Sequence, residues 1–129
     1  LMTMLSWLKS LFKIKPLPRK TMELQANLQA IGGLPMQGEA EFETYENGEW
    51  EFETEVDFRN GSPAEPLTVY MKGRPIMSLR AEYDESEGKL SSRRGDILSV
   101  TPEEGMPIEV KRGGETVLAG QFERHPKFA

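Results

Sequence analysis

Six glutamates alternate with apolar or small residues in the segment "GEAEFETYENGEWEFETEVDF" (38–58), where side chains capable of chemistry are most concentrated. Closely spaced carboxylates can bind hard cations, act as an acid and base pair, or attract a basic partner. Their spacing at every second residue predicts two strands that carry all six on one side. The candidate acidic face consists of Glu39, Glu41, Glu43, Glu51, Glu53 and Glu55.

The turn between these two strands decides which residues face one another. A two-residue loop, Asn47-Gly48, would set Phe42 opposite Glu53 and leave neither face apolar. A three-residue loop over 46–48, with its glycine left-handed, sets Phe42 opposite Phe52 and restores an apolar face. We therefore predict the second register. It opposes Glu43 to Glu51, Glu41 to Glu53, and Glu39 to Glu55.

Like charges directly opposed on a sheet cost up to about 1 kcal/mol per pair before screening, so the acidic face needs a reason. One interpretation is a solvated surface that keeps the protein soluble and prevents sheets from stacking. A second is a docking surface for a basic partner. A third, calcium binding, requires six to eight convergent oxygens, whereas glutamates on a flat face point outward in parallel. The segment "DESEG" (84–88) begins like a calcium loop, but Gly95 stands where the last ligand belongs, and we expect a turn.

Catalytic motifs are missing from the sequence. The single histidine, His125, lies in the segment "ERHPKFA" without a nucleophile motif, and "RRGD" (93–96) has the composition of a turn. The sequence contains no glycine-rich phosphate loop, no GxSxG motif and no pair of metal-binding histidines. Zero cysteines exclude disulfides, zinc-thiolate sites and iron–sulfur clusters. We expect no enzyme activity, catalytic residue, resident metal, cofactor or small-molecule substrate.

Charge is divided unevenly along the 129 residues, which are the length of one domain. Residues 1–20 hold five basic side chains and no acid. Subtracting them from the chain's 16 leaves 11 basic against 21 acidic residues for the rest. An acidic body cannot neutralise phosphates, so a nucleic-acid partner is not expected.

Residues 1–15 form the pattern of an amphipathic helix, which we call the arm. Its apolar side is expected to hold Met4, Leu5, Trp7, Leu8, Leu11, Phe12 and Ile14, while Lys9 and Lys13 lie on the polar side. Lys9 and Lys13 interrupt the run of apolar residues, which is therefore much shorter than the roughly 20 residues that a bilayer span requires. The arm could instead lie on an anionic lipid surface, fill a groove of a membrane protein complex, or cover one end of its own domain. Prolines in the linker (16–21) favour the first two alternatives because they hold the arm away from the body.

The remainder of the chain alternates with a period of two. Expected strands occupy 22–30, the two acidic segments, 66–73, 74–83, 88–93, 96–100, 106–112 and 115–124, with turn residues between them. The pattern predicts an all-β fold, an antiparallel Greek-key-type β-sandwich of about eight or nine short strands over 22–124, followed by a tail at 125–129.

Three stretches carry a family resemblance: "ELQANLQAIGGLPMQGEAEFE", "LTVYMKGRPIMSL" and "GMPIEVKRGGETVLAGQFE". With their "GxAxF", "VxxxG" and "GxF" patterns, they resemble the CHRD-like group of small bacterial β-sandwich proteins over roughly residues 23–123. The resemblance implies a Greek-key sandwich and no established chemistry. Members often carry histidines in the middle strands, and this chain has none there.

Together these features predict a non-enzymatic accessory subunit that docks through the arm on a membrane surface or a large membrane complex, such as a respiratory or photosynthetic one. Lysines beside the arm favour the cytoplasmic leaflet, so the expected location is peripheral, on the cytoplasmic face of a bacterial inner membrane. The alternative is a soluble or surface-exposed sandwich whose acidic face binds cations or a basic partner.

Overall fold

A computed structural model describes residues 18–61 and 64–128, so the arm and its anchoring side chains lie outside the described residues. The strands are β1 (Lys20–Ala30), β2 (Met36–Tyr45), β3 (Trp50–Phe58), β4 (Leu67–Met71), β5 (Arg74–Ser78), β6 (Arg80–Glu82), β7 (Glu85–Ser91), β8 (Pro107–Arg112), β9 (Glu115–Gln121) and β10 (Glu123–Arg124). Three short 3₁₀ turns are η1 (Ile31–Gly33), η2 (Ser92–Arg94) and η3 (Pro126–Phe128).

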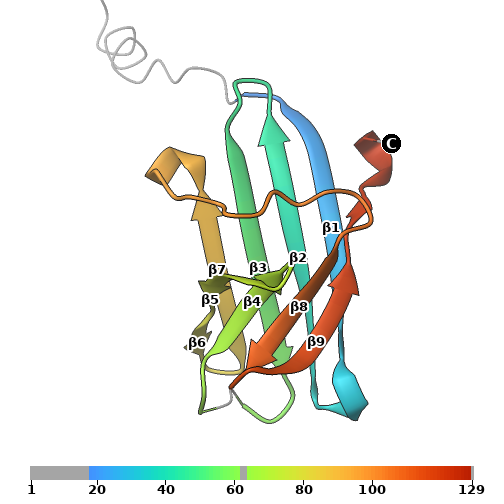
Figure 1. Ribbon diagram of the computed structural model, residues 1–129, viewed down its shortest axis with the longest axis vertical. Coiled ribbons are helices and arrows are strands. Elements are labelled where there is room, and N and C mark those ends of the chain that lie inside the picture. Colours follow the sequence, from blue (N-terminus) through green and yellow to red (C-terminus); the bar gives the residue numbers. More distant parts are fainter. Residues whose placement is uncertain (1–17, 62–63, 129) are drawn as a thin grey trace, which may run out of the picture.

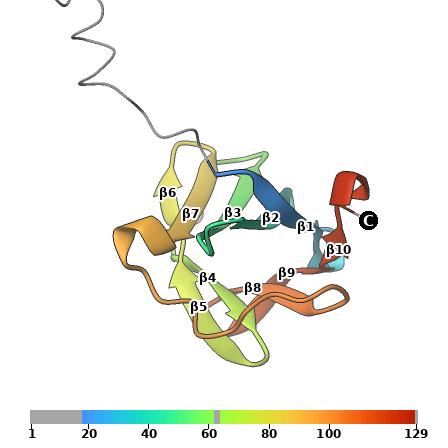
Figure 2. The ribbon, with the colours of Figure 1, turned by 90° about the horizontal axis from the view of Figure 1, so that it is seen from above.

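All ten strands belong to one sheet with antiparallel pairing, which confirms the predicted antiparallel all-β fold. The strand order is β5-β4-β8-β9-β1-β2-β3-β7-β6, and β10 also pairs with β1. The sheet curls into a nearly closed, barrel-like form. Strands β1, β2, β3 and β7 make one wall, which faces a second wall of β4, β5, β8 and β9 (Figures 1 and 2). We call this unit, residues 20–124, the β domain.

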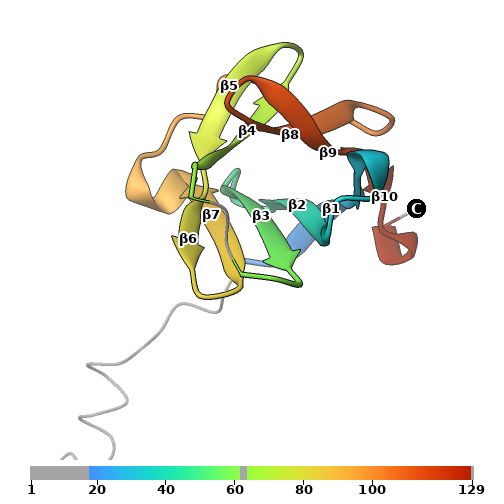
Figure 3. The same cartoon turned by 90° about the horizontal axis from the view of Figure 1, so that it is seen from below.

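Two features close the sheet. Strand β1 pairs with β2 along its length, and with β9 and β10 on its other edge, where Gln29 lies opposite Ala119 and Leu24 opposite Arg124. At the other seam β5 and β6 are separated only by Leu79, whose N–H donates to the carbonyl of Leu67 at 2.8 Å. Viewed from below, the two walls enclose a single interior (Figure 3).

The β2–β3 hairpin has the predicted register: Phe42 lies opposite Phe52, and each glutamate lies opposite the expected glutamate. Its turn closes through hydrogen bonds from the Tyr45 N–H to the Glu49 carbonyl (2.9 Å) and from the Gly48 N–H to the Tyr45 carbonyl (3.0 Å). Gly48 has φ of 85°, the left-handed conformation that the three-residue loop requires.

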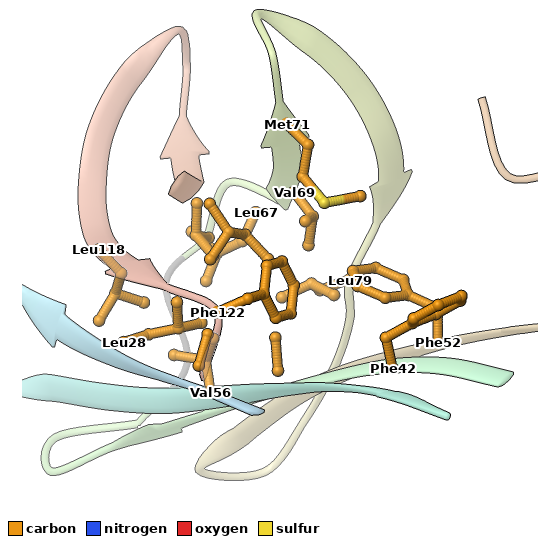
Figure 4. Close-up of a cluster of buried hydrophobic side chains, with 14 of the residues drawn as sticks. Leu28, Phe42, Phe52, Val56, Leu67, Val69, Met71, Leu79, Leu118 and Phe122 are labelled. Carbon is orange, nitrogen blue, oxygen red and sulfur yellow. The ribbon is translucent and has the colours of Figure 1, made fainter. Parts of the chain in front are cut away.

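Side chains from both walls fill the interior (Figure 4). Phe52 on β3 and Phe122, just after β9, meet with ring centroids 6.5 Å apart. Gly120 is needed where β9 passes β1, because a Cβ there would lie 2.3 Å from the carbonyl oxygen of Asn27. The core is therefore formed by packing across the two walls.

Several predicted elements differ from the structure. The strand predicted at 74–83 is divided into β5 and β6, and the one at 115–124 into β9 and β10, so the sheet has ten strands where about eight or nine were predicted. The segment at 96–100, expected as a strand, makes no strand, although it buries Val100 and leaves Ile97 85% exposed. The segment "DESEG", expected as a turn, starts β7 at Glu85. Alternation of Glu85, Ser86 and Glu87 was the available strand signal, since Ser86 is buried between two outward glutamates.

The "RRGD" segment forms a turn, as predicted, and also protects a sheet edge. The Ser91 N–H donates to Asp96 Oδ2 at 2.9 Å, and the Asp96 N–H donates to the Ser91 carbonyl at 3.2 Å. The Arg94 guanidinium donates to the Lys89 carbonyl. These contacts occupy backbone groups on the part of β7 that β6 does not cover.

Thr54 on β3 provides a test of the core. Its side chain is fully buried, and Oγ1 has no hydrogen-bond partner among the described residues. Replacing the hydroxyl by a methyl group in Thr54→Val should raise the free energy of unfolding by about 1 to 2 kcal/mol, measured by urea denaturation. The exposed Thr101→Val is the control and should change stability little. A Thr54→Val protein that is less stable would contradict the described environment.

Candidate functional site

The acidic face forms on the outer surface of β2 and β3. Glu43 lies opposite Glu51, Glu41 opposite Glu53, and Glu39 opposite Glu55. The intervening residues Ala40, Phe42 and Val56 are buried, so the alternation predicted from the sequence separates the core from the carboxylates. The predicted face is thus present with the predicted pairs.

Four further carboxylates extend this surface along β3 and onto the neighbouring strands β1 and β7. Glu23 on β1 pairs with Glu43, and Glu87 on β7 pairs with Glu55. Asp57 at the end of β3 pairs with Glu85. None of these four was among the face residues that the sequence predicts. The polar side of 22–30 already contained Glu23, whereas Glu85 and Glu87 were hidden by the turn assigned to "DESEG".

The first carboxylate group, Glu23, Glu41 and Glu43, has oxygen atoms within 4.8 Å of one another. Lys20 occupies the space between two of them, with Nζ 2.9 Å from Glu43 Oε1 and 3.2 Å from Glu23 Oε1. The Tyr45 hydroxyl donates to Glu43 Oε2 at 2.7 Å. An ammonium group therefore already serves this group as its cation.

The pKa values of the side chains in this group follow from these contacts. Burial raises the pKa of Glu43, but the hydrogen bonds from Tyr45 and Lys20 outweigh it and leave that pKa below its ordinary value. Burial and the hydrogen bond to Glu43 raise the pKa of Tyr45 to about 12. Burial and repulsion from Glu23 raise the pKa of Glu41. Glu43 thus stays ionised and neighbouring Glu41 holds its proton more tightly.

The second carboxylate group, Glu55, Asp57 and Glu85, also has oxygens within 4.8 Å of one another. Desolvation and repulsion from Glu55 raise the pKa of Glu85 to about 7. Desolvation and repulsion from Asp57 raise the pKa of Glu55. Repulsion in this group is therefore relieved when a carboxylate takes up a proton, whereas in the first group Lys20 supplies the positive charge.

A polar surface groove adjoins the second group. It lies over the ends of β1, β2 and β3, and its polar lining residues are Asn27, Gln29, Gln37, Glu39, Glu55 and Asp57. Carboxylates and amide oxygens together accept hydrogen bonds from ammonium groups and coordinate hard cations. The groove could therefore receive a lysine side chain or a metal ion.

His125 lies against β1 and is half-buried. Its Nδ1 accepts from the Lys127 N–H at 3.2 Å, so the neutral ring carries its proton on Nε2, which lies 3.7 Å from Glu23 Oε2. Glu23 itself is only 8% exposed. These contacts fix the start of η3 against β1 and give His125 a structural environment.

The predicted anchoring residues of the arm lie outside the described residues. Within 18–61 and 64–128, no helix is long and apolar enough to cross a membrane. No family model matches the chain, and no curated protein shows significant sequence similarity to it. The likeness to the CHRD-like group therefore rests on the quoted motifs alone.

The raised pKa of Glu85 predicts a pH-dependent stability change. Because the folded-state pKa of about 7 exceeds the ordinary 4.5, the unfolded chain releases this proton first as pH rises, and folding stability falls over that window. Glu85→Gln should therefore raise the melting midpoint above pH 7 and leave it little changed below pH 4.5. Glu115→Gln, an exposed change of equal charge, is the control. An equal effect of Glu85→Gln at pH 4 and pH 8 would contradict the assignment.

Proposed function

We propose that this protein is a non-enzymatic accessory subunit, held through its arm on a membrane surface or on a large membrane complex. Respiratory and photosynthetic complexes are the candidate hosts, and the cytoplasmic face of a bacterial inner membrane is the proposed location. In this proposal the two walls act as a Greek-key-type sandwich that covers an exposed part of the host.

The arm carries the proposal. Seven large apolar side chains fall on one side of a 15-residue helical pattern, with Lys9 and Lys13 on the other. The apolar side of an amphipathic helix is stable only when lipid or protein covers it.

The base of the arm supports the same function. The Arg19 N–H donates to Glu46 Oε1 at 3.2 Å, and the Glu46 N–H donates to the Arg19 carbonyl at 2.9 Å. Lys20 begins β1 and bonds Glu23 and Glu43. Because the chain is bonded to the β2–β3 turn from Arg19 onward, an anchored arm would hold the β domain close to its host.

Substitutions in the arm test this function. Leu8→Gln, Leu11→Gln and Phe12→Gln together remove apolar area without adding charge, so the triple variant should move from the membrane fraction to the soluble fraction. Ser6→Gln and Ser10→Gln, on the polar side, form the control and should leave the distribution unchanged. Sedimentation of native membranes followed by immunodetection gives the measurement. A triple variant that remains fully membrane-bound would exclude the arm as the anchor.

A second candidate function is binding of a cation or a basic partner at the second carboxylate group. The observation that favours it is the close approach of three carboxylates, whose oxygens lie within 4.8 Å of one another. The raised pKa values of Glu55 and Glu85 reflect repulsion between negative charges, which a metal ion or a lysine ammonium would relieve. The adjoining groove supplies amide oxygens that such a ligand would use.

Melting with calcium chloride, and separately with a lysine-rich peptide, tests this candidate. Either ligand should raise the melting midpoint of the native protein at pH 7.5, since binding stabilises the folded state. The variant Glu55→Gln, Asp57→Asn, Glu85→Gln should lose that rise, whereas the control Glu103→Gln, Glu115→Gln, Glu123→Gln, with equal charge change elsewhere, should keep it. An equal rise in both variants would indicate general charge screening and exclude the site.

A further inference from the structure

We infer that the β domain stands upright on an anionic lipid surface, with its β2–β3 turn toward the lipid and the second carboxylate group away from it. This inference rests on the proposed function, since the arm must first bring the protein to the membrane, and it commits to lipid as the arm's partner. It assigns an orientation and a lipid-facing end to the β domain.

Basic side chains neutralise the end at which the arm joins. Arg93 forms an ion pair with Glu49 beside the β2–β3 turn, and the Arg93 guanidinium lies 5.7 Å from the ring centroid of Tyr45. The other pairs at this end include Arg19 with Glu46, Lys20 with both Glu23 and Glu43, and Arg94 with Asp96. Lys127 lines a second surface groove, at this end, together with Arg19 and Lys20, and adds another positive charge. Carboxylates here are matched by bases.

The opposite end of the same wall is acidic. It carries the ends of β3 and β6 and the start of β7. Its six carboxylates, Glu55, Asp57, Glu82, Asp84, Glu85 and Glu87, outnumber its two bases, Arg59 just after β3 and Arg80 opposite Glu87. Among the described residues, Lys and Arg form no ion pair with Glu55, Asp57, Glu82, Asp84 or Glu87. This end would be repelled by anionic headgroups.

Distance decides how strongly each orientation is favoured. The nine residues of β3 separate the two ends by about 30 Å at roughly 3.3 Å per residue. The Debye length at physiological salt is about 8 Å, so the acidic end of an upright domain lies beyond the reach of the surface potential. A domain lying on its acidic face would hold the same carboxylates within that reach. Electrostatic repulsion therefore selects the upright orientation.

Two asparagines at the ends of β3 allow a direct test. The chain contains no cysteine, so Asn47→Cys in the β2–β3 turn and Asn60→Cys beyond β3 each give a single labelling position, and both sites are exposed. Each full-length variant would carry an environment-insensitive fluorophore and bind vesicles of phosphatidylcholine and phosphatidylglycerol that contain a nitroxide-headgroup lipid. Fluorescence quenching by the nitroxide reports contact with the surface.

The label at position 47 should be quenched several-fold more than the label at position 60. Equal quenching, or stronger quenching at 60, would overturn the orientation while leaving membrane binding intact. A protein that binds native membranes but not these vesicles would overturn lipid as the partner, and a protein that binds neither would also overturn the proposed function.

A charge variant tests the cause. Changing Glu55, Asp57, Glu82, Glu85 and Glu87 to the corresponding amides should increase quenching at position 60, because the repulsion that holds this end away is removed. As a control, Glu65, Glu103, Glu109, Glu115 and Glu123, outside this wall, would be changed to Gln, which should leave the difference between the two labels in place. A difference unaltered by the first variant would show that repulsion does not set the orientation.

Discussion

The register of the β2–β3 hairpin is the constraint on which the rest of the structure depends. With Gly48 left-handed, the three-residue turn sets Phe42 opposite Phe52 and sends both rings into the core. A shift of one residue would turn each strand over and expose its apolar side. The same register necessarily places glutamate opposite glutamate. Burial of large side chains outweighs repulsion between solvated charges, so the opposed carboxylates are a consequence of building the core.

Repulsion between the carboxylates on the outer surface of β1, β2, β3 and β7 is relieved in two different ways. Near the arm, Lys20 and the Tyr45 hydroxyl bond Glu43, which remains ionised with a lowered pKa. At the far end the pKa values of Glu55 and Glu85 are raised, that of Glu85 to about 7, so these carboxylates take up a proton more readily. One end is therefore compensated by fixed positive charge, and the other changes its charge close to neutral pH. A cation that binds near the arm would have to displace the Lys20 ammonium group, whereas one that binds at the far end would have to displace only a proton.

Local patterns predicted the parts of the fold that depend on neighbouring residues. Alternation and one glycine were sufficient for the hairpin, because its register is set within a short stretch of chain. Pairing of β1 with β9 joins residues far apart in sequence, Gln29 with Ala119, and no local pattern encodes it. Ile97, Leu98 and Val100 have strand-like composition, yet they form no strand, because Val100 reaches the core and Leu98 packs against it without a strand partner while Ile97 stays exposed. The place of Glu85 beside the acidic face depends on the pairing of β7 with β3, which the sequence pattern did not predict.

A filled interior confines recognition to the surface. Phe52 and Phe122 meet where a ligand-binding barrel would hold its cavity, and the described grooves are open surface depressions lined largely by polar and charged groups. The surface itself is uneven, because bases cluster where the chain enters β1 and carboxylates dominate the far end of the same wall. In the membrane-bound orientation proposed above, the neutralised end would face an anionic surface and the acidic end would face the solution. Membrane attachment and binding of a basic partner are therefore compatible, since each would use a different end of one rigid wall.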